Sequence, residues 1–220
     1  MKNVSRETKS KTKNKNGVFH VKQFDEFSEK TKEKFKIYEE TLKKWQKKIN
    51  LVSPTTLSDI VNRHIMDSAQ LAPLITGRHK KILDMGSGAG FPGLVLAILN
   101  QNEGRGDWNV HLVESDARKC AFIQEVARLT NTKIYLHNCR IESLTDFKAD
   151  VITARALKEV KTLIEYAVPF LLPGTHCLFL KGKNVDLELE WATNSYNFVV
   201  KKIPSITQGS FILEITEISE

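Results

Sequence analysis

The sequence predicts an α/β protein with a mostly parallel, doubly wound sheet, an antiparallel last pair of strands and a helical N-terminal extension. Three observations indicate this fold. Short apolar runs alternate with helical patterns from residue 82 onward. A glycine-rich turn joins the first apolar run, 82–85, to a helix expected near Pro92. Two alternating segments, 198–203 and 211–218, are joined by a Pro/Gly turn and predict a closing hairpin.

We divide the 220 residues into a basic leader at 1–22, a helical extension at 23–76 and an α/β domain at 77–220, of which the leader is set apart by its charge. The leader holds seven basic residues and one acid, so it carries +6 (7 − 1) of the formal net charge of +7. It has few large apolar residues, and we therefore expect it to be disordered. A nucleic-acid-binding arm and a solubilising segment both remain open as its role.

No segment of the sequence indicates secretion or a membrane span. The longest uninterrupted apolar run, 94–99, is too short to cross a bilayer. Three cysteines, Cys120, Cys139 and Cys177, lie apart with no C-x-x-C pair, which favours a reducing compartment and no structural metal. We therefore expect a cytoplasmic protein, without metal or membrane attachment, that acts as a monomer.

The extension is predicted to contain two amphipathic helices. In the first, between residues 24 and 49, apolar residues spaced by three and four share one face: Phe35, Tyr38, Leu42, Trp45 and Ile49. The second begins near Leu57 and places His64 on its apolar face. A histidine on such a face is more often hydrogen-bonded within the core than a residue that binds a ligand. Arg63 and Asp67, four residues apart on this helix, have the spacing of an ion pair.

The turn after the first strand of the domain has the pattern of a ligand-binding loop. Asp84 is followed by Gly86, Gly88 and Gly90 at alternate positions. Glycine accepts positive φ and lets a ligand approach the backbone. The spacing differs from the dinucleotide fingerprint G-x-G-x-x-G, and no P-loop lysine follows. The pattern instead resembles the cofactor loop of S-adenosylmethionine-dependent methyltransferases.

Polar residues follow the next strands where a doubly wound sheet binds its ligands. The second strand, 108–113, ends at Glu114, whose carboxylate can accept both ribose hydroxyls of an adenosine. Its alternative role is to cap the next helix, but the following Ser115-Asp116 pair already offers capping side chains. A helix through Leu129 and a third strand at 133–137 come next, and the loop 138–142 would lie beside the adenine.

The fourth and fifth strands, 150–153 and 177–180, place two cations near the same edge. Arg155 follows the fourth strand and Lys181 the fifth, and we expect both at the methyl-transfer end of the crevice. The lysines at 181 and 183 could contact the substrate, or they could simply belong to a turn exposed to solvent. Helices are predicted at 157–172, ended by a Pro-Gly pair, and at 185–196.

Five segments together resemble one family, the bacterial small-subunit (16S) rRNA guanine-N7 methyltransferases, also called glucose-inhibited division protein B. They are 45–51 (WQKKINL), 63–68 (RHIMDS), 83–93 (LDMGSGAGFPG), 153–156 (TARA) and 180–183 (LKGK). The resemblance implies a Rossmann-like methyltransferase sheet and S-adenosylmethionine contacts at Gly86, Phe91, Ile141, Glu142 and Arg155, with Glu114 at the ribose. We also expect Asp84 and Gly88 of the glycine loop to belong to the cofactor site. The resemblance also implies 16S rRNA or the small ribosomal subunit as partner. We expect Arg155 and Lys181, which follow the two central strands, to be the catalytic residues.

The residues of the chain also bear on other functions. The chain lacks a Pro-Cys nucleophile of the kind used for cytosine C5 and a Pro-Pro loop of the kind used for exocyclic amines. Guanine N7 needs no general base, because its lone pair is free. A methyltransferase acting on a small molecule or protein, a nicotinamide-dependent oxidoreductase and a non-catalytic RNA-binding relative are the alternatives; the glycine spacing argues against the oxidoreductase.

Overall fold

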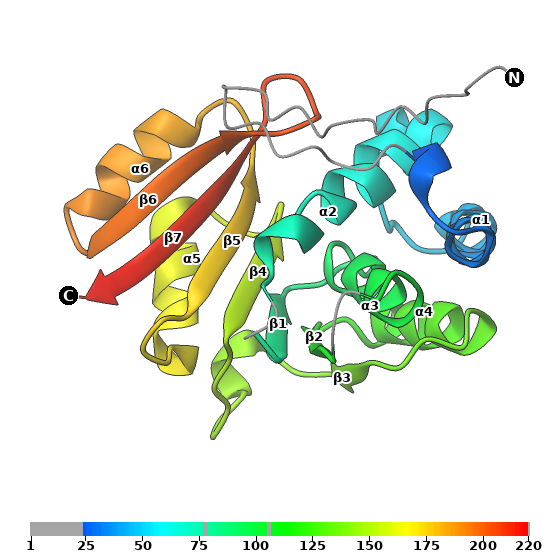
Figure 1. Cartoon of the computed structure of the whole chain (residues 1–220), viewed down its shortest axis with the longest axis horizontal. Coiled ribbons are helices and arrows are strands. Elements are labelled where there is room, and N and C mark those ends of the chain that lie inside the picture. The colour runs from blue at the N-terminus through cyan, green and yellow to red at the C-terminus, as the bar shows by residue number, and fades with distance from the viewer. Residues whose placement is uncertain (1–23, 77–78, 105–106, 220) are drawn as a thin grey trace, which may run out of the picture.

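The computed structural model describes residues 24–76, 79–104 and 107–219, and the basic leader at 1–22 lies outside them. One seven-stranded sheet with the order β3-β2-β1-β4-β5-β7-β6 forms the centre of this part of the chain (Figure 1). Its strands are β1 (Lys81–Met85), β2 (Asn109–Val113), β3 (Tyr135–His137), β4 (Val151–Arg155), β5 (His176–Lys181), β6 (Asn197–Pro204) and β7 (Phe211–Ser219).

The sheet is parallel from β3 to β5 and antiparallel beyond. β7 pairs antiparallel with both β5 and β6, which confirms the predicted antiparallel last pair. The chain runs outward from β1 to β3 and then returns to place β4 on the other side of β1. This reversal creates a crevice between the carboxyl ends of β1 and β4, where sheets of this kind bind ligands.

The helices have recognisable local signals. Ser28 caps α1 by accepting a hydrogen bond from the Thr31 amide, and Asp116 caps α4 by accepting one from the Arg118 amide. Pro92 precedes α3, as predicted. The helices are α1 (Glu29–Gln46), α2 (Asp67–Ala69), α3 (Gly93–Asn102), α4 (Ala117–Leu129), α5 (Val160–Ala167) and α6 (Val185–Thr193).

Two apolar clusters cover the two faces of the sheet, because successive strand residues point to opposite sides. In β1, Ile82 belongs to the cluster under α1, α3 and α4, whereas Leu83 and Met85 belong to the cluster under α5 and α6. Figure 1 shows α3 and α4 grouped with the extension on one side and α5 and α6 on the other. Both faces of the central strands are therefore buried.

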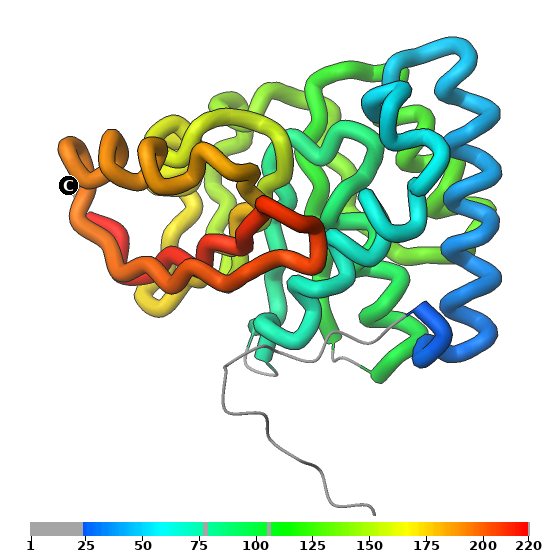
Figure 2. The backbone as a smooth tube through the Cα atoms, turned by 90° about the horizontal axis from the view of Figure 1, so that it is seen from above, coloured from blue at the N-terminus to red at the C-terminus, as the bar shows by residue number. Residues whose placement is uncertain are grey.

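The extension is docked on the domain and shares its core. Phe35, Tyr38 and Leu42 of α1 are almost fully buried against the cluster that includes α3 and α4. Figure 2 shows α1 along one flank, at the end opposite α6. The predicted apolar stripe of α1 is confirmed, although Trp45 and Ile49 are only partly buried at its end.

Several predicted boundaries differ from the structure. The second helix of the extension is irregular: a 3-10 helix (Pro54–Asp59), a π-helix (Val61–Met66) and then α2. α5 covers only the middle of the predicted helix 157–172, because Pro169 has no N–H to continue it. Arg155 is the last residue of β4 rather than a residue beyond the strand.

Candidate functional site

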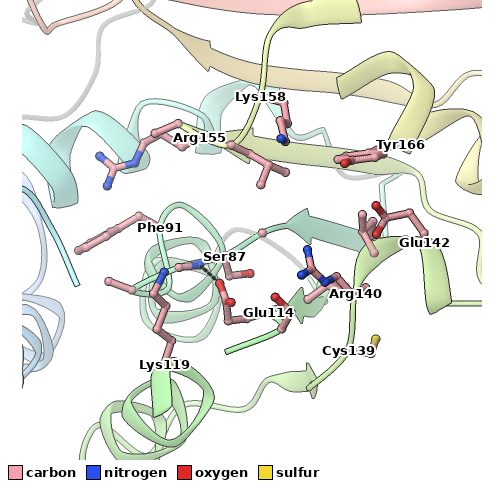
Figure 3. Close-up of a pocket in the computed structure, with 18 of the residues that line it drawn as sticks. Ser87, Phe91, Glu114, Lys119, Cys139, Arg140, Glu142, Arg155, Lys158 and Tyr166 are labelled. Carbon is pink, nitrogen blue, oxygen red and sulfur yellow. Dashed lines mark hydrogen bonds between the residues drawn. The ribbon is translucent and has the colours of Figure 1, made fainter. Parts of the chain in front are cut away.

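A hollow of about 360 Å³ opens at the carboxyl ends of the parallel strands. We call it the first hollow. Figure 3 shows Arg155 and Phe91 toward one end and Glu142 and Tyr166 toward the other. Most of its lining comes from the ends of β1, β2, β3 and β4 and the loops that follow them, with Leu51 from the extension, Lys119 from α4 and Tyr166 from α5. The residues that line it are Leu51, Gly86, Ser87, Gly88, Ala89, Phe91, Val113, Glu114, Ser115, Lys119, Cys139, Arg140, Ile141, Glu142, Arg155, Ala156, Leu157, Lys158 and Tyr166.

The glycine loop has a backbone that other residues adopt only with strain. Gly86, Gly88 and Gly90 have φ of 63°, 58° and 89°. A Cβ on Gly86 would also lie 2.5 Å from Leu157 Cδ1. The geometry of these glycines therefore agrees with the prediction of a turn that requires positive φ and in which a ligand can approach the backbone.

Glu114 connects the end of β2 to the glycine loop. Its Oε2 accepts a hydrogen bond from the Gly88 amide at 2.8 Å, shown dashed in Figure 3, and its Oε1 accepts one from the Asp116 amide at 2.8 Å. A carboxylate has about four acceptor positions, so two remain for a ligand. Glu114 is mostly buried but lines the first hollow.

Asp84 lies beneath the loop and is not among the residues that line the first hollow. Its carboxylate accepts hydrogen bonds from Thr153 Oγ1 at 2.8 Å and from the Gly93 amide at 3.1 Å. Burial raises the pKa of Asp84 to about 6, against the opposing effect of these hydrogen bonds. The position fits a residue that holds the loop on β4 and α3 rather than one that contacts a ligand.

Aromatic rings form a stack behind the loop. Tyr38 stacks on Phe91 with ring centres 5.1 Å apart, and its hydroxyl donates to the Ala89 carbonyl. His64 stacks on Phe91 at 5.2 Å, and the Arg155 guanidinium carbon lies 4.8 Å from the centre of the Phe91 ring. Residues that the sequence assigns to the core of the extension thus also support the glycine loop.

The Arg155 guanidinium is held by the extension. Nη2 donates to His64 Nδ1 at 2.7 Å, Nη1 donates to the Arg63 carbonyl at 3.1 Å, and Nη1 lies 3.5 Å from Asp67 Oδ2. Burial and the charges of Arg155 and Arg63 lower the pKa of His64 to about 3. His64 is therefore a neutral acceptor, and Arg155, rather than Arg63, is the ion-pair partner of Asp67.

A second hollow of about 420 Å³ adjoins the first. Leu51, Arg155 and Ala156 line both. Ala156 has φ of 51°, a conformation that costs free energy in a residue other than glycine and is found at functional sites. The remaining lining residues are Val52, Ser53, Thr56, Arg63, His64, Asp67, Leu180, Lys181, Gly182, Thr207 and Ser210.

Lys181 lies at the second hollow with its ammonium engaged by the protein. Its Nζ is 2.6 Å from Glu188 Oε2 and donates to the Lys158 carbonyl at 2.8 Å. Glu188 also accepts from the Val160 amide at the start of α5. Lys181 thus connects the loop after β4 to α6, and it shares the second hollow with Arg155.

A family model described as rRNA small subunit methyltransferase G matches residues 31–211 of the chain. The chain belongs to this family of rRNA methyltransferases. It is 46% identical over 193 residues to the ribosomal RNA small subunit methyltransferase G of Paramagnetospirillum magneticum, covering 87% of this chain and 91% of the relative. It is 48% identical over 192 residues to the protein of that name from Rhodospirillum rubrum, covering 87% and 92%.

A solved structure shares the fold of this family member. The ribosomal protein L11 methylase of Lactobacillus delbrueckii subsp. bulgaricus superposes with a TM-score of 0.57 and 19% identity, covering 70% of this chain and 78% of that one. The predicted Rossmann-like methyltransferase fold is thereby confirmed. In the described part of the chain no helix is long and apolar enough to cross a membrane, and no cluster of metal-ligating side chains occurs.

Several residues of the first hollow, such as Lys119 and Tyr166, were not predicted from the sequence, whereas Arg140 lies in the loop 138–142 that was expected beside the adenine. Tyr166 comes from α5, more than fifty positions after Glu114, and no local pattern connects the two. Lys119 lies in the first turn of α4, directly after the Glu114 loop, and that position was the one available signal. Of the residues expected at the cofactor, Gly86, Gly88, Phe91, Glu114, Ile141, Glu142 and Arg155 line the first hollow.

Proposed function

We propose that the chain binds S-adenosylmethionine in the first hollow and transfers its methyl group to N7 of a guanine of 16S rRNA held in the second hollow. The observation that carries this proposal is that the two hollows adjoin and share Arg155 as a wall. Membership of the rRNA small subunit methyltransferase G family supports the reaction class and the rRNA substrate.

The order of residues along the first hollow matches the parts of the cofactor. Figure 3 shows Glu142 toward the end opposite Phe91, and Glu142 and its neighbour Ile141 would lie beside the adenine. Glu114 would accept the ribose hydroxyls, and Phe91, with Gly86 and Gly88, would lie along the methionine portion. Arg155 stands at the far end, where a planar guanidinium suits a carboxylate. Asp84 supports this arrangement from below the loop.

The chemistry of the transfer suits these surroundings. The N7 lone pair attacks the methyl carbon, the carbon–sulfur bond breaks with its electrons moving to sulfur, and the sulfonium becomes a neutral thioether. No proton leaves in this step, and the guanine becomes cationic. The protein therefore contributes mainly alignment of N7, carbon and sulfur, an effect that reaches about 7–11 kcal/mol in well-oriented reactions.

Labelled S-adenosylmethionine offered with unmodified small ribosomal subunits, naked 16S rRNA and bulk protein tests the proposal. We expect label in 16S rRNA as N7-methylguanosine, identified by nuclease digestion and mass spectrometry. Label in a protein, a small molecule or another nucleoside would overturn it. The same assay locates the modified guanine and decides between subunit and naked RNA.

Lys181→Ala separates the two catalytic assignments. We propose that this lysine serves RNA binding at the second hollow, so the variant should bind RNA more weakly yet recover most of its single-turnover rate at saturating RNA. Arg155→Ala should lose rate and cofactor affinity together. A Lys181→Ala enzyme that stays slow at saturating RNA, beside an Arg155→Ala enzyme with normal rate, would contradict these roles.

A further inference from the structure

The guanidinium of Arg155 is surrounded by polar partners that lie outside the methyltransferase sheet. We call these partners, His64, Arg63 and Asp67, the socket. Arg155 ends β4, but its hydrogen-bond acceptors, the Arg63 carbonyl and His64 Nδ1, and its ion-pair partner Asp67 all belong to the irregular helical segment of the extension. Its side chain is 15% exposed and that of Asp67 is 11% exposed. A cation at this depth needs its partners, because an unpaired buried charge is costly.

Each partner of Arg155 is in turn fixed in one orientation. His64 presents Nδ1 to Arg155 while its Nε2 lies 2.8 Å from Thr56 Oγ1. Nδ1 must accept from the guanidinium, so the proton resides on Nε2 and is donated to the threonine. The ring is also held flat against Phe91. His64 is therefore placed to hold Arg155 rather than to take a proton from a substrate.

Asp67 connects Arg155 to a third part of the chain. Its Oδ2 faces Arg155, whereas its Oδ1 accepts from Ser205 Oγ at 3.0 Å, Thr207 Oγ1 at 3.1 Å and Gln70 Nε2 at 2.9 Å. Ser205 and Thr207 lie in the connection between β6 and β7. That connection supplies Thr207 and Ser210 to the second hollow. The Asp67 carboxylate thus connects Arg155 to the segment between β6 and β7 that lines the second hollow.

We propose that Asp67 and His64 are positioning residues, which hold the Arg155 guanidinium between the two hollows so that it orients cofactor and acceptor base at once. This inference rests on the proposed function for the identity of cofactor and base. Arg155 is the group that touches the ligands, and Asp67 and His64 act through it. The extension consequently completes the methyl-transfer site as well as packing on the domain.

Asp67→Asn is the sharpest perturbation of this socket. The three donors at Oδ1 keep the amide oxygen of the variant on their side, so the connection between β6 and β7 stays held. The amide NH2 of the variant then faces the Arg155 guanidinium. Because both groups only donate hydrogen bonds, the ion pair is replaced by an unfavourable contact between two donors. His64→Phe is an independent second variant, because it keeps the stack on Phe91 and removes the acceptor for Arg155, together with the hydrogen bond to Thr56.

The test is a pair of double-variant cycles, each measured by calorimetric affinity for S-adenosylhomocysteine and by single-turnover methylation of unmodified small subunits. We expect Asp67→Asn and His64→Phe each to weaken cofactor binding several-fold and to slow transfer by roughly tenfold. In the Arg155→Ala background, neither should reduce affinity or rate further. Losses that multiply in the double variants, or singles equal to the unsubstituted protein, would overturn the proposal.

A matched control breaks a different contact between extension and domain. Glu103, after α3, accepts hydrogen bonds from Ser28 and Thr31 at the start of α1 and does not contact Arg155. Glu103→Gln should leave affinity and rate unchanged while lowering the melting temperature. The affinity cycle needs no RNA, so it tests the roles of Asp67 and His64 even if the unsubstituted protein fails to methylate rRNA. Such a failure would count against the proposed function alone.

Discussion

Replacing Glu114 with alanine gives the most direct test of where the cofactor ribose binds. In the structure each carboxylate oxygen accepts one backbone amide, from Gly88 and from Asp116. Two of the roughly four acceptor positions remain, which matches the two ribose hydroxyls. Hydrogen bonds to a charged group contribute about 1.5–3 kcal/mol, and water partly replaces them in the variant. We therefore expect a net loss of about 1–3 kcal/mol, or roughly 5- to 150-fold in Kd.

Calorimetry with S-adenosylhomocysteine and its 3′-deoxy analogue separates a ribose contact from damage to the loop. The unsubstituted protein should bind the deoxy analogue more weakly than the complete ligand, because one acceptor then lacks its donor. Glu114→Ala should bind both ligands equally. If affinity is unchanged in Glu114→Ala, or if the variant keeps the full penalty for the missing hydroxyl, then the ribose assignment is wrong. Melting temperatures of both proteins report the loss of the Gly88 and Asp116 contacts.

Three further results are expected. Gly93→Ala should lower the unfolding free energy by about 1–3 kcal/mol in denaturant titrations, because its Cβ would lie 2.8 Å from Asp84 Oδ2, whereas Gly182→Ala meets nothing within 4 Å and should be neutral. The low pKa of His64, about 3 through burial and nearby arginines, means that between pH 6.5 and 3 the unfolded chain binds a proton that the folded protein does not. Stability should therefore fall as pH falls from 7 to 5, and His64→Phe should lose this part of the slope in denaturant titrations at the two pH values; an identical slope would count against a neutral His64. Deleting residues 1–18 should weaken RNA binding at low salt and flatten its salt dependence without changing cofactor affinity, and filter-binding titrations that show an unchanged slope would leave the leader a solubilising segment.

Local patterns in the sequence determined the central elements of this protein. The apolar run before Gly86, the alternating glycines and Pro92 predict β1, the loop and α3, because each signal acts within a few residues of the structure it specifies. The alternating pattern near the end of the chain predicts β6 and β7 for the same reason. Glu114 was identified from its place at the end of a strand, since parallel strands deliver their carboxyl ends to one edge.

Only the tertiary structure decided how the site is assembled. Asp84 has the spacing of a loop ligand, yet its side chain is buried against Thr153 and Gly93, because residue spacing does not determine how far a side chain lies from the surface. His64 and Asp67 have the pattern of an ordinary packed helix. Their partner Arg155 lies about ninety positions further along the chain, and no periodic signal spans such a separation. Contacts of this kind arise from the packing of the extension on the sheet, where burial forces each polar group to find whichever partner the fold places beside it.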